Sequence, residues 1–595
     1  MTNSSPPSNT RLKSPTLHSD KTNHQESFDA IVIGSGAGGM TAAAYLAAAG
    51  KRTLVLESYT VIGGCTHVFR RKNKWEFDVG IHYLGDCGPQ GVIPTLLNGV
   101  GLKGKVEFLP LDPAGFDTIV FPDRTLKVPK GWDQYRKNLI AAFPDEEKQI
   151  LKIVDILEKV GRSIDRSTTP ASLPGLAKFL AKSGLTARWA LRTLTQLLDA
   201  HQLSSGLKSA FAVQYGTYAS PPHRTPVAVH ATMLQNFLRD GAWFPKGGGQ
   251  VLSARLGEVI VANGGEIRTR APVGRILIEN KKVVGVELEN GTRINAPIVV
   301  SNADIKNTYL KMVGREHIRR STAWRINRMR MSQPFFNCYL GVDIDLTEHM
   351  SNTNFYSIPT SEDMTSLYYD LTENRGGYSQ DELIEQSRKR LGAYISVTST
   401  KDRGNLRAAP EGCSVLEVMT LCPEDLAFWG LDHWPKDGDE SYRKNARYRK
   451  SKEAMTQIMI QRVSEVIPGI EKHIVWCEAA TPLTQHRYTR ASGGTPYGIE
   501  LSISQFVPFR PGVRTEINGL YMCGASMAWG PAVEGAMLSG MHAAAAVLDR
   551  DLNTEIRSGT VLGVTLPTDP EGEWDPFEVA QAVAGKRRRR RVIVR

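Results

Sequence analysis

The sequence has few cysteines, and their spacing does not fit a disulfide framework or a structural zinc site. Its 595 residues include seven cysteines, and no two of them form a C-x-x-C pair. Histidine and carboxylate residues show no metal-ligand spacing either, and no G-x-S-x-G motif indicates a serine hydrolase. These absences argue against metal chemistry and suit a reducing compartment.

The excess of positive over negative charge is small outside the C-terminus. The formal net charge is +12, of which Lys586 and Arg587 to Arg591 supply six, so 12 − 6 leaves +6 for the rest of the chain. The folded part is therefore only mildly basic, and nucleic-acid binding is not predicted. The basic run has two interpretations: a solvated tail, or a segment attracted to anionic lipid headgroups at about 1 kcal/mol per basic residue.

The chain also lacks a secretory signal. Residues 1–27 are rich in Ser, Thr, Pro, Asn and Lys and have no apolar core, which predicts a disordered N-terminal extension. Two alanine-rich stretches, 30–50 and 518–548, are long enough to cross a bilayer, but their glycines, and Glu534 in the second, weaken that interpretation. We therefore expect a cytoplasmic protein.

Residues 28–57, FDAIVIGSGAGGMTAAAYLAAAGKRTLVLE, carry the most informative pattern. An apolar run ends at Gly34, and Gly34, Gly36 and Gly39 then form G-x-G-x-x-G before an alanine-rich segment and a second apolar run that ends at Glu57. This order predicts strand, tight turn, helix and strand. The glycines allow the turn, the approach of a pyrophosphate and close helix packing, and the acid accepts ribose hydroxyls. The pattern predicts a dinucleotide site.

The apolar pattern returns to this unit twice later in the chain. Residues 243–304 predict a glycine turn, a helix, a β-hairpin and a buried strand, and 518–548 again reads as strand, glycine turn and alanine-rich helix. A second helix N-terminus suits the far end of one long ligand, and in FAD that end is the flavin, which gains negative charge on reduction. The alternative is that 518–548 is simply a buried core helix.

We therefore predict an α/β fold in which a Rossmann-like FAD-binding domain is interleaved with a mixed α+β substrate domain. The discontinuous FAD-binding domain is expected to comprise 28–110, 243–304 and 470–550. The substrate domain would comprise 111–242 and 305–469, with a helix over 145–164, and a C-terminal tail would comprise 551–595.

Two further segments resemble a known family. Ile62 to Gly85 reads IGGCTHVFRRKNKWEFDVGIHYLG, and Thr481 to Gly498 reads TPLTQHRYTRASGGTPYG. With the dinucleotide motif, they make residues 28–550 similar to the FAD-dependent superfamily of phytoene desaturases, carotenoid isomerases and retinol saturases, which is related to the amine oxidases. The stretch Phe77 to Tyr83 matches the retinol saturase branch more closely than the bacterial phytoene desaturases.

The resemblance implies cofactor-binding positions along the whole chain. It places the pyrophosphate against the first glycine turn, the ribose at Glu57, the adenine at the backbone of Val273 and the flavin at the second glycine turn. The implied cofactor-binding residues are Gly34, Ser35, Gly36, Ala37, Gly39, Glu57, Gly63, Gly64, Val273, Gly524, Ala525, Val533 and Glu534. His82 and Tyr83 would lie near the flavin ring.

One position departs from the family pattern. Desaturases usually carry arginine after the glycine pair, whereas Cys65 follows Gly63 and Gly64 here. The fixed positive charge of an arginine is therefore missing beside the cofactor, so the flavin potential or the set of substrates can differ. Cys65 is interpreted either as a small packing residue or as a redox or covalent participant.

The resemblance implies chemistry on a C=C bond of a long apolar isoprenoid, carotenoid or retinoid in type. Flavin N5 would give or accept a hydride, and saturation would also need a proton, for which His82 and Tyr83 are the candidates. His486, Tyr488 and Tyr497 are weaker candidates. A nicotinamide would be a transient electron partner, as would a quinone or oxygen, and saturation, desaturation and isomerisation all remain open.

An apolar substrate of this kind resides in membranes, so we expect peripheral contact with an anionic membrane surface. Pro334 to Phe336 and Gln505 to Phe509 are interpreted as tunnel lining or as ordinary core.

Two other functions remain as alternatives: a flavin amine or alcohol oxidase of the same fold, and a flavin-free protein that binds prenylated GTPases. The sequence does not predict an oligomeric state.

Overall fold

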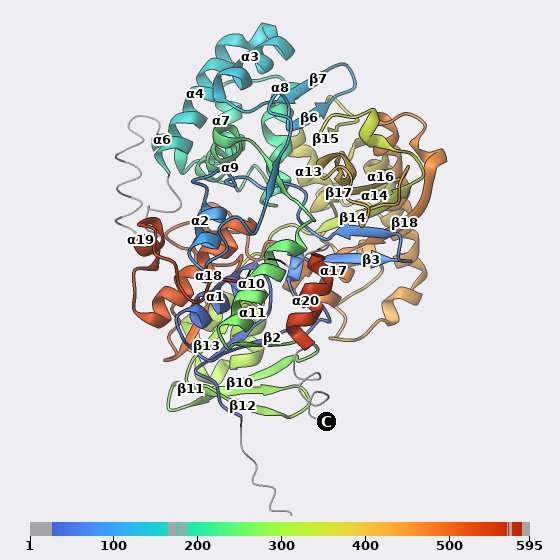
Figure 1. Cartoon of the computed structure of the whole chain (residues 1–595). Coiled ribbons are helices and arrows are strands. Elements are labelled where there is room, and N and C mark those ends of the chain that lie inside the picture. Colours follow the sequence, from blue (N-terminus) through green and yellow to red (C-terminus); the bar gives the residue numbers. More distant parts are fainter. Residues whose placement is uncertain are drawn as a thin grey trace, which may run out of the picture.

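The computed structural model describes residues 26–585 except 165–173, 175, 176, 178–180, 182–186, 568 and 570–573. The predicted disordered extension therefore lies almost wholly outside the described residues, as does the basic run 586–591. Figure 1 shows two interleaved units, the first in the lower half of the view and the second in the upper half. The chain passes between them several times.

The first unit is built on a parallel sheet of the predicted Rossmann-like type. Its strand order is β19-β13-β1-β2-β9, and every neighbouring pair is parallel. The strands are β1 (Ala30–Ile33), β2 (Thr53–Leu56), β9 (Glu266–Arg268), β13 (Val299–Ser301) and β19 (Leu520–Met522). Segments from both ends of the chain therefore complete one sheet, as the sequence predicted.

Both faces of this sheet are buried, which explains why its strands are continuously apolar. Ala30 and Val32 of β1 face one core, whereas Ile31 and Ile33 face the other. The first core is covered by helices and the second by a small antiparallel sheet with helical segments of residues 305–329. The covering helices are α1 (Ala37–Ala48), α2 (Val92–Asn98), α10 (Gln250–Ala262) and α18 (Ala532–Leu548).

Smaller elements complete the first unit. The antiparallel sheet consists of β10 (Val273–Glu279), β11 (Lys282–Leu288) and β12 (Arg293–Asn295). A hairpin joins β3 (Val68–Arg71) to β4 (Trp75–Asp78), and β5 (Phe108–Pro110) pairs antiparallel with the distant β8 (Trp243–Pro245). Helices α11 (Ile305–Asn307) and α12 (Arg320–Arg328) follow β13.

Helices α1 and α18 cross at very short range because glycines face each other there. A Cβ at Gly540 would lie 2.2 Å from the carbonyl oxygen of Gly38, and a Cβ at Gly39 would lie 2.1 Å from the carbonyl oxygen of Gly34. The glycine spacing therefore brings helix α1 close both to the sheet and to α18, which holds the two ends of the chain together.

Replacing Gly540 with alanine is therefore expected to lower the free energy of unfolding by about 1–3 kcal/mol, the usual cost of overpacking. Its methyl group would push against a backbone oxygen rather than a movable side chain. Urea unfolding followed by circular dichroism measures the change. Gly512→Ala is the matched control, since no heavy atom lies within 4 Å of a Cβ there. Equal stability of both variants would contradict the proposed close crossing.

The second unit is built on a seven-stranded mixed sheet with the order β18-β14-β17-β16-β15-β6-β7. Its strands are β6 (Asp117–Val120), β7 (Thr125–Val128), β14 (Phe335–Val342), β15 (Asn354–Ser357), β16 (Ala393–Val397), β17 (Ser414–Leu421) and β18 (Ile474–Ala480). Strand β18 lies within the range assigned to the FAD-binding domain from the sequence, yet it pairs with β14 in this sheet.

Helices cover the second sheet and form its core with it. They are α3 (Trp132–Ala142), α4 (Glu147–Ser163), α6 (Ala187–Ala190), α7 (Leu194–Ala200), α8 (Ser205–Ala212), α9 (Val227–Asp240), α13 (Met364–Thr372), α14 (Gln380–Arg390), α15 (Thr398–Lys401), α16 (Ala446–Val466) and α17 (Pro482–Thr489). Helix α4 matches the helix predicted over 145–164. Its apolar residues at helical spacing, such as Ile150, Ile153 and Leu157, are buried.

The residues after 550, which the sequence suggested were a tail, include two helices that pack on the first unit. These are α19 (Leu552–Arg557) and α20 (Pro576–Gly585), and α20 contributes Ala580 and Val583 to the core beside α10. Arg70 donates to Asp575 at 2.7 and 2.8 Å, and the Arg255 guanidinium lies 3.6 Å from the ring centre of Trp574.

Within the described part of the chain, no helix combines the length and apolar character needed to cross a bilayer.

Candidate active site

One cavity of about 640 Å³ extends from the first glycine turn into the second unit. Its wall begins at Gly34 to Gly38, at the carboxyl end of β1, and continues past residues 64–67 and 79–85 to an aromatic region between the helices and sheet of the second unit. Ligands of open α/β sheets bind in this position, beyond the carboxyl ends of the strands. The cavity therefore joins the predicted dinucleotide site to an apolar chamber.

The first glycine turn leaves the start of helix α1 open to the cavity. Helix α1 begins after Gly36, and no side-chain hydrogen bond caps it among the described residues. Gly34, Ser35, Gly36 and Ala37 all line the cavity, whereas Gly39 faces the sheet instead. Backbone N–H groups and the helix dipole at this position favour a phosphate.

Asn302 is a site residue that the sequence interpretation missed. It follows β13, lines the cavity, and lies where three glycines meet. A Cβ at Gly36, Gly38 or Gly524 would lie 2.6–2.7 Å from its side-chain amide, so a larger residue at any of these positions would force the Asn302 side chain to move. The sequence does contain an indication of this position. Asn302 follows the predicted buried strand 298–301, whose carboxyl end would reach the same edge of the sheet as the first glycine turn.

Glu57 lies at the end of β2, in the cavity wall, as the motif predicted. Its Oε2 accepts hydrogen bonds from Ser35 N at 2.9 Å and Ser35 Oγ at 2.6 Å, and its Oε1 accepts one from Tyr59 N at 2.7 Å. The carboxylate is 7% exposed. These contacts fix its orientation beside the first glycine turn, where it can accept a further hydrogen bond from a hydroxyl group of a ligand.

The pair Gly63-Gly64 lies against the first glycine turn. Gly63 N donates to the Ser35 carbonyl at 3.1 Å, and a Cβ at Gly64 would lie 2.9 Å from the Cα of Gly36. Gly64 lines the cavity. The cavity wall then reaches Cys65, whose Sγ accepts a hydrogen bond from Gln485 at 3.3 Å. Burial raises the pKa of the Cys65 thiol, which disfavours the thiolate and supports the packing interpretation.

The second glycine turn adjoins the first, since a Cβ at Gly38 would lie 2.9 Å from the nitrogen of Gly524. Gly524, Ala525, Val533 and Glu534 line the cavity, and the Gly524 N–H donates to Ser539 Oγ at 2.7 Å. The buried Arg510 fixes this segment by donating to the carbonyls of Ala525 at 2.7 Å and Met527 at 2.8 Å. At the other end of the cavity, Val273 lies at the start of β10, where the resemblance places the adenine.

His82 and Tyr83 both line the cavity, but their surroundings differ. Both ring nitrogens of His82 are buried and lack a hydrogen-bond partner among the described residues. Burial and the nearby Lys401 lower the pKa of His82 to about 3, so its ring is neutral at physiological pH. Two unpartnered nitrogens in a cavity wall are suited to a ligand that supplies the missing hydrogen bonds.

Tyr83 belongs to a buried polar network. Its hydroxyl donates to Asp117 Oδ2 at 3.3 Å and lies 3.3 Å from the hydroxyl of Tyr356, which also lines the cavity. Asp117 is held by Gln214 at 2.6 Å and by Asn354 at 2.9 Å. Burial raises the pKa of Asp117 to about 6 despite these hydrogen bonds. A group that titrates near neutral pH therefore contacts a hydroxyl in the cavity wall.

A buried lysine lies behind His82. Lys401, at the end of α15, is 3% exposed and donates to the His82 carbonyl and to Ser396 Oγ, the latter at 2.8 Å. Burial lowers the pKa of Lys401 to about 8, against the opposing effect of Glu417, Asp117 and Asp78. Burial also raises the pKa of Glu417 to about 7. Lys401 thus fixes the backbone that carries His82 and Tyr83.

The far part of the cavity is apolar and aromatic. Its wall includes Phe237, Phe335, Tyr368, Tyr394, Met419, Tyr497, Leu501 and Phe506. Of the two segments interpreted as tunnel or core, Phe335, Phe506 and Val507 line the cavity, whereas Phe336 is fully buried elsewhere. Ring contacts at 4.8 and 5.9 Å stack Tyr83 between Phe237 and Tyr394. The wall suits a long apolar ligand.

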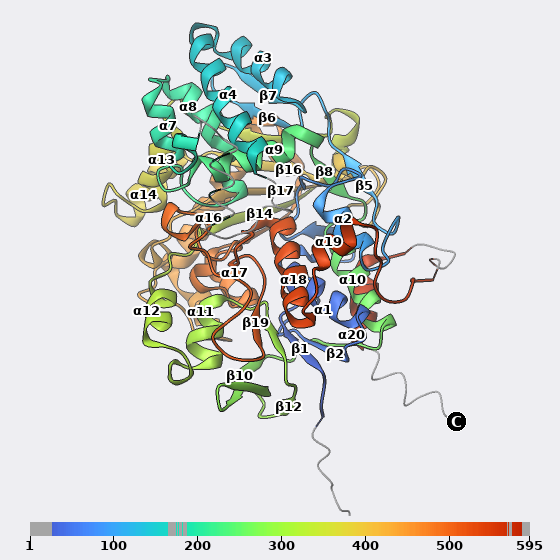
Figure 2. The same cartoon turned by 90° about the vertical axis from the view of Figure 1, so that its left-hand side faces the viewer.

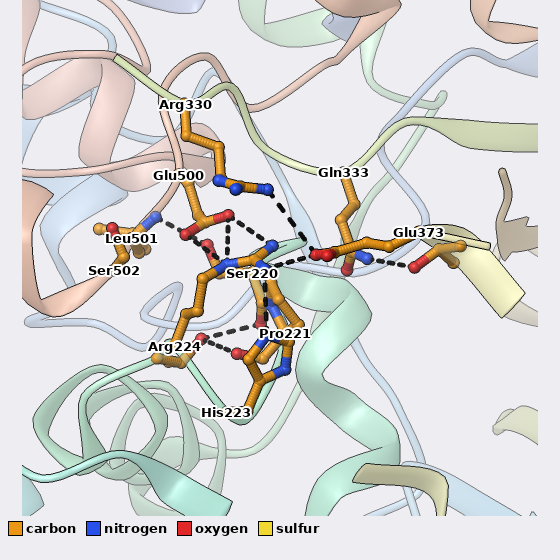
Figure 3. Close-up of polar contacts among 12 residues, drawn as sticks. Ser220, Pro221, His223, Arg224, Arg330, Gln333, Glu373, Glu500, Leu501 and Ser502 are labelled. Atoms are coloured by element: carbon orange, nitrogen blue, oxygen red, sulfur yellow. Dashed lines mark hydrogen bonds and ion pairs between the residues drawn. The ribbon is translucent and has the colours of Figure 1, made fainter. Parts of the chain in front are cut away.

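Figure 3 shows an ion network that fixes one side of this chamber. Arg224 donates to both oxygens of Glu500, at 2.9 and 3.0 Å, and also to Glu373. The neighbouring Leu501 N–H donates to Ser220 Oγ at 2.7 Å. Because Leu501 lines the cavity, the network anchors the segment 500–507 to the helical part of the second unit.

The three weaker candidates for a proton donor, His486, Tyr488 and Tyr497, differ in their position relative to the cavity. Tyr488 and Tyr497 line the cavity, whereas His486 lies outside its wall, with its ring nitrogens 3.1 Å from the Ala491 carbonyl and 3.2 Å from that of Pro435. His486 is therefore held by backbone and is not a proton donor in the cavity.

In the part of the chain that the structure describes, no three His, Cys, Asp or Glu side chains form a metal-binding group.

The fold is that of known flavin-dependent amine oxidases. Cyclohexylamine oxidase of Brevibacterium oxydans superposes with a TM-score of 0.57 at 16% identity, covering 89% of this chain and 99% of that one. An oxidoreductase of Methanosarcina mazei gives a TM-score of 0.56 at 19% identity, covering 88% and 100%. These likenesses define a class of fold, an amine-oxidase-type Rossmann domain with an inserted substrate domain.

The sequence places the chain in a family within that class. The profile of the flavin containing amine oxidoreductases matches residues 37–375 and 448–548, and the chain belongs to this family. It is 29% identical to the all-trans-retinol 13,14-reductase of Danio rerio over 550 residues, covering 89% of this chain and 87% of that protein. It is 26% identical to the chloroplastic prolycopene isomerase of Daucus carota over 561 residues, covering 91% and 84%. The resemblance stated from the motifs, including its retinol saturase branch, is confirmed.

Proposed function

We propose that this flavin oxidoreductase acts on a C=C bond of a long apolar isoprenoid, of the carotenoid or retinoid type, with FAD as its cofactor. One observation carries the proposal: a single cavity joins the open N-terminus of α1 and the acid Glu57 to an aromatic chamber. Relatives named for a retinol reductase and a prolycopene isomerase support an isoprenoid substrate.

The residues present fit FAD. Gly36, Gly38 and Gly524 leave no room for a Cβ beside Asn302, so backbone lines the places where the pyrophosphate and flavin would lie. When bound, FAD supplies a hydride donor or acceptor at N5. Its electron partner, a nicotinamide, a quinone or oxygen, would meet it transiently. The unpartnered nitrogens of His82 would hydrogen-bond to the cofactor or the substrate.

Tyr83 is the better candidate for moving a proton. His82 is neutral because burial and Lys401 lower its pKa to about 3, so it has no imidazolium proton to give. Tyr83 has a hydroxyl in the cavity wall and a hydrogen bond to Asp117, whose pKa of about 6 lets it exchange protons near neutral pH. Tyr83 would thus transfer a proton to or from a substrate carbon. Asp117 would then return a proton to the Tyr83 hydroxyl or take one from it.

The reaction is tested by incubating the FAD-loaded protein with polyenes and retinoids in the absence of oxygen. Products are scored by mass: a gain of two hydrogens for saturation, a loss of two for desaturation, and no change with an altered elution time for isomerisation. Failure to convert any polyene, together with flavin reduction by amines or alcohols, would favour the alternative of an oxidase with the same fold.

Replacing Glu57 with alanine is expected to weaken FAD binding by about 10- to 100-fold, because a hydrogen bond to a charged group contributes about 1.5–3 kcal/mol. The flavin-to-protein ratio after dialysis measures the loss. Glu57→Gln is the matched control, since one amide oxygen can still accept from Ser35 and the ribose, and it should retain more flavin. Unchanged flavin content in Glu57→Ala would refute the ribose assignment.

A further inference from the structure

An exposed aromatic and basic surface lies beside the loop that borders the cavity. We name it the Trp324 surface, and it comprises the outer face of α12 with residues 503–509. Trp324 is 62% exposed and Phe509 is 58% exposed, while Ile503 adds a third exposed apolar side chain. Large apolar side chains that cluster at the surface indicate a binding site for another molecule or a membrane.

Contacts show that α12 and the loop form one surface. Arg325 of α12 donates to the carbonyl of Phe509. Arg330, just after α12, donates its N–H to Gln505 Oε1 at 2.8 Å and accepts from Gln505 Nε2 at 2.9 Å. The Arg328 guanidinium lies 4.9 Å from the ring centre of Trp324. The aromatic side chains and the arginines are therefore held together.

The segment that contains α12 is strongly positive. Residues 315–330, which extend beyond α12 at both ends, contain six arginines and one glutamate, so their net charge is 6 − 1 = +5. Glu516 pairs with Arg319 at 3.2 Å and Glu373 with Arg330 at 3.7 Å, which leaves 5 − 2 = +3. A tryptophan and a phenylalanine among uncompensated arginines match the interface of an anionic bilayer, where aromatic rings lie at headgroup level.

The same loop reaches the cavity from its other side. Phe506 and Val507 line the cavity, whereas Ile503 and Phe509, three and two residues away, are exposed on the Trp324 surface. The loop is thus a thin partition between the outer surface and the apolar chamber. An apolar molecule leaving a bilayer at this surface would meet cavity-lining side chains within one loop.

We propose that the Trp324 surface docks on an anionic lipid bilayer and that the apolar substrate enters the cavity past residues 503–509. The entry route rests on the proposed function, whereas docking itself does not. Figure 2 shows α12 on the side of the molecule opposite α20, the last described helix before the basic C-terminal run. The docking surface thus consists of residues other than the basic run 586–591, for which the sequence predicted contact with anionic lipid.

Docking is tested by co-sedimentation of the purified full-length protein with vesicles of phosphatidylcholine, with or without 30% phosphatidylserine, at low salt. Arg320→Gln combined with Arg328→Gln is expected to weaken binding to the anionic vesicles roughly 30-fold, from about 1 kcal/mol for each arginine. Trp324→Glu combined with Phe509→Glu is expected to reduce it at least as far. Neutral vesicles should bind the wild-type protein weakly.

Matched controls lie on α4, which carries an exposed leucine between exposed lysines. Lys148→Gln with Lys152→Gln removes two positive charges there, as the arginine variant does, and Leu151→Glu separately replaces one exposed apolar side chain by an acid. Both should leave vesicle binding unchanged. A variant with serine in place of Lys586 and Arg587 to Arg591 tests the C-terminal run. Loss of binding in that variant or in the α4 variants, with normal binding when Trp324 and Phe509 are changed, would overturn the proposal.

The entry route and the reaction are separated by the form in which substrate is supplied. With substrate in vesicles, Trp324→Glu combined with Phe509→Glu should lower turnover roughly 30-fold or more, in proportion to its lost vesicle binding. With the same substrate in detergent, turnover should equal that of the wild type. Equal loss in both assays would overturn the entry route. Vesicle binding that depends on Trp324, in a protein that converts no polyene, would refute the proposed function alone.

Discussion

Replacing Tyr83 with phenylalanine is expected to slow conversion of the polyene substrate by about 10²- to 10⁴-fold, the range lost when a general acid or base is removed. The substitution removes the hydroxyl that contacts Asp117 and Tyr356 but keeps the ring stacked between Phe237 and Tyr394. Flavin content should therefore stay unchanged. Single-turnover kinetics under anaerobic conditions measure the effect.

The pH dependence tells which way the proton moves. Burial raises the pKa of Asp117 to about 6, so the carboxyl group is protonated below that pH and ionised above it. If the enzyme saturates its substrate, Asp117 must return a proton to Tyr83, and the rate should fall as pH rises through about 6. If it desaturates, Asp117 must accept a proton, and the rate should rise over the same interval.

Two variants control this experiment. Asp117→Asn should flatten the pH profile while keeping Tyr83 in place. Tyr135→Phe, which changes a buried tyrosine of α3 outside the cavity wall, should leave the rate unaltered. A Tyr83→Phe enzyme as fast as the wild type, with the same pH profile, would rule out Tyr83 as the group that transfers the proton.

Replacing Lys401 with methionine is expected to lower the free energy of unfolding by about 3–5 kcal/mol at pH 8, the usual cost of removing one partner from a buried charge cluster. Methionine keeps most of the side-chain volume but removes the cation that faces Glu417, Asp117 and Asp78. It also frees the carbonyl of His82, so flavin retention should fall as well.

The loss should shrink at pH 5. The folded-state pKa values of Glu417, about 7, and Asp117, about 6, lie above the usual carboxyl range, so folding takes up protons at these groups as pH falls. Below those values both acids are neutral and need no counter-charge, and removing Lys401 costs less. Urea unfolding at pH 5 and pH 8 measures the difference.

Lys137→Met on α3 is the matched control, because this lysine is exposed and its loss should change stability by no more than about 0.5 kcal/mol. A Lys401→Met protein with wild-type stability at pH 8 would show that the buried acids are neutral there without its help. That result would also weaken the assignment of Asp117 as an exchangeable group.

The parts of the fold that sequence could predict are those fixed by local spacing. Gly34, Gly36 and Gly39 lie within six residues, and the strand before them and Glu57 after them are read from neighbouring residues. The first glycine turn, Glu57 and the second turn at Gly524 accordingly lie in one cavity wall. Val273, His82 and Tyr83, which came from the resemblance, also line it.

The buried network behind Tyr83 was beyond the reach of sequence patterns. Asp117 is contributed by β6, Lys401 by α15 and Glu417 by β17, and Asp117 lies far from the other two in the sequence. All three side chains are buried, and no sequence motif marks them. They come together because β15 pairs with both β6 and β16, and β16 pairs with β17. Long-range strand pairing is determined by tertiary packing, so it cannot be predicted from a short motif.

The order in which the first unit is assembled has a consequence for biosynthesis. Strand β1 and the first glycine turn lie within residues 30–39, yet the sheet edge at β19 and the helix that packs on α1 are made only at residues 520–548. During synthesis on the ribosome, the first sheet therefore stays incomplete while the intervening residues are made. Flavin loading should accordingly follow the synthesis of α18, and products truncated before residue 520 should be colourless.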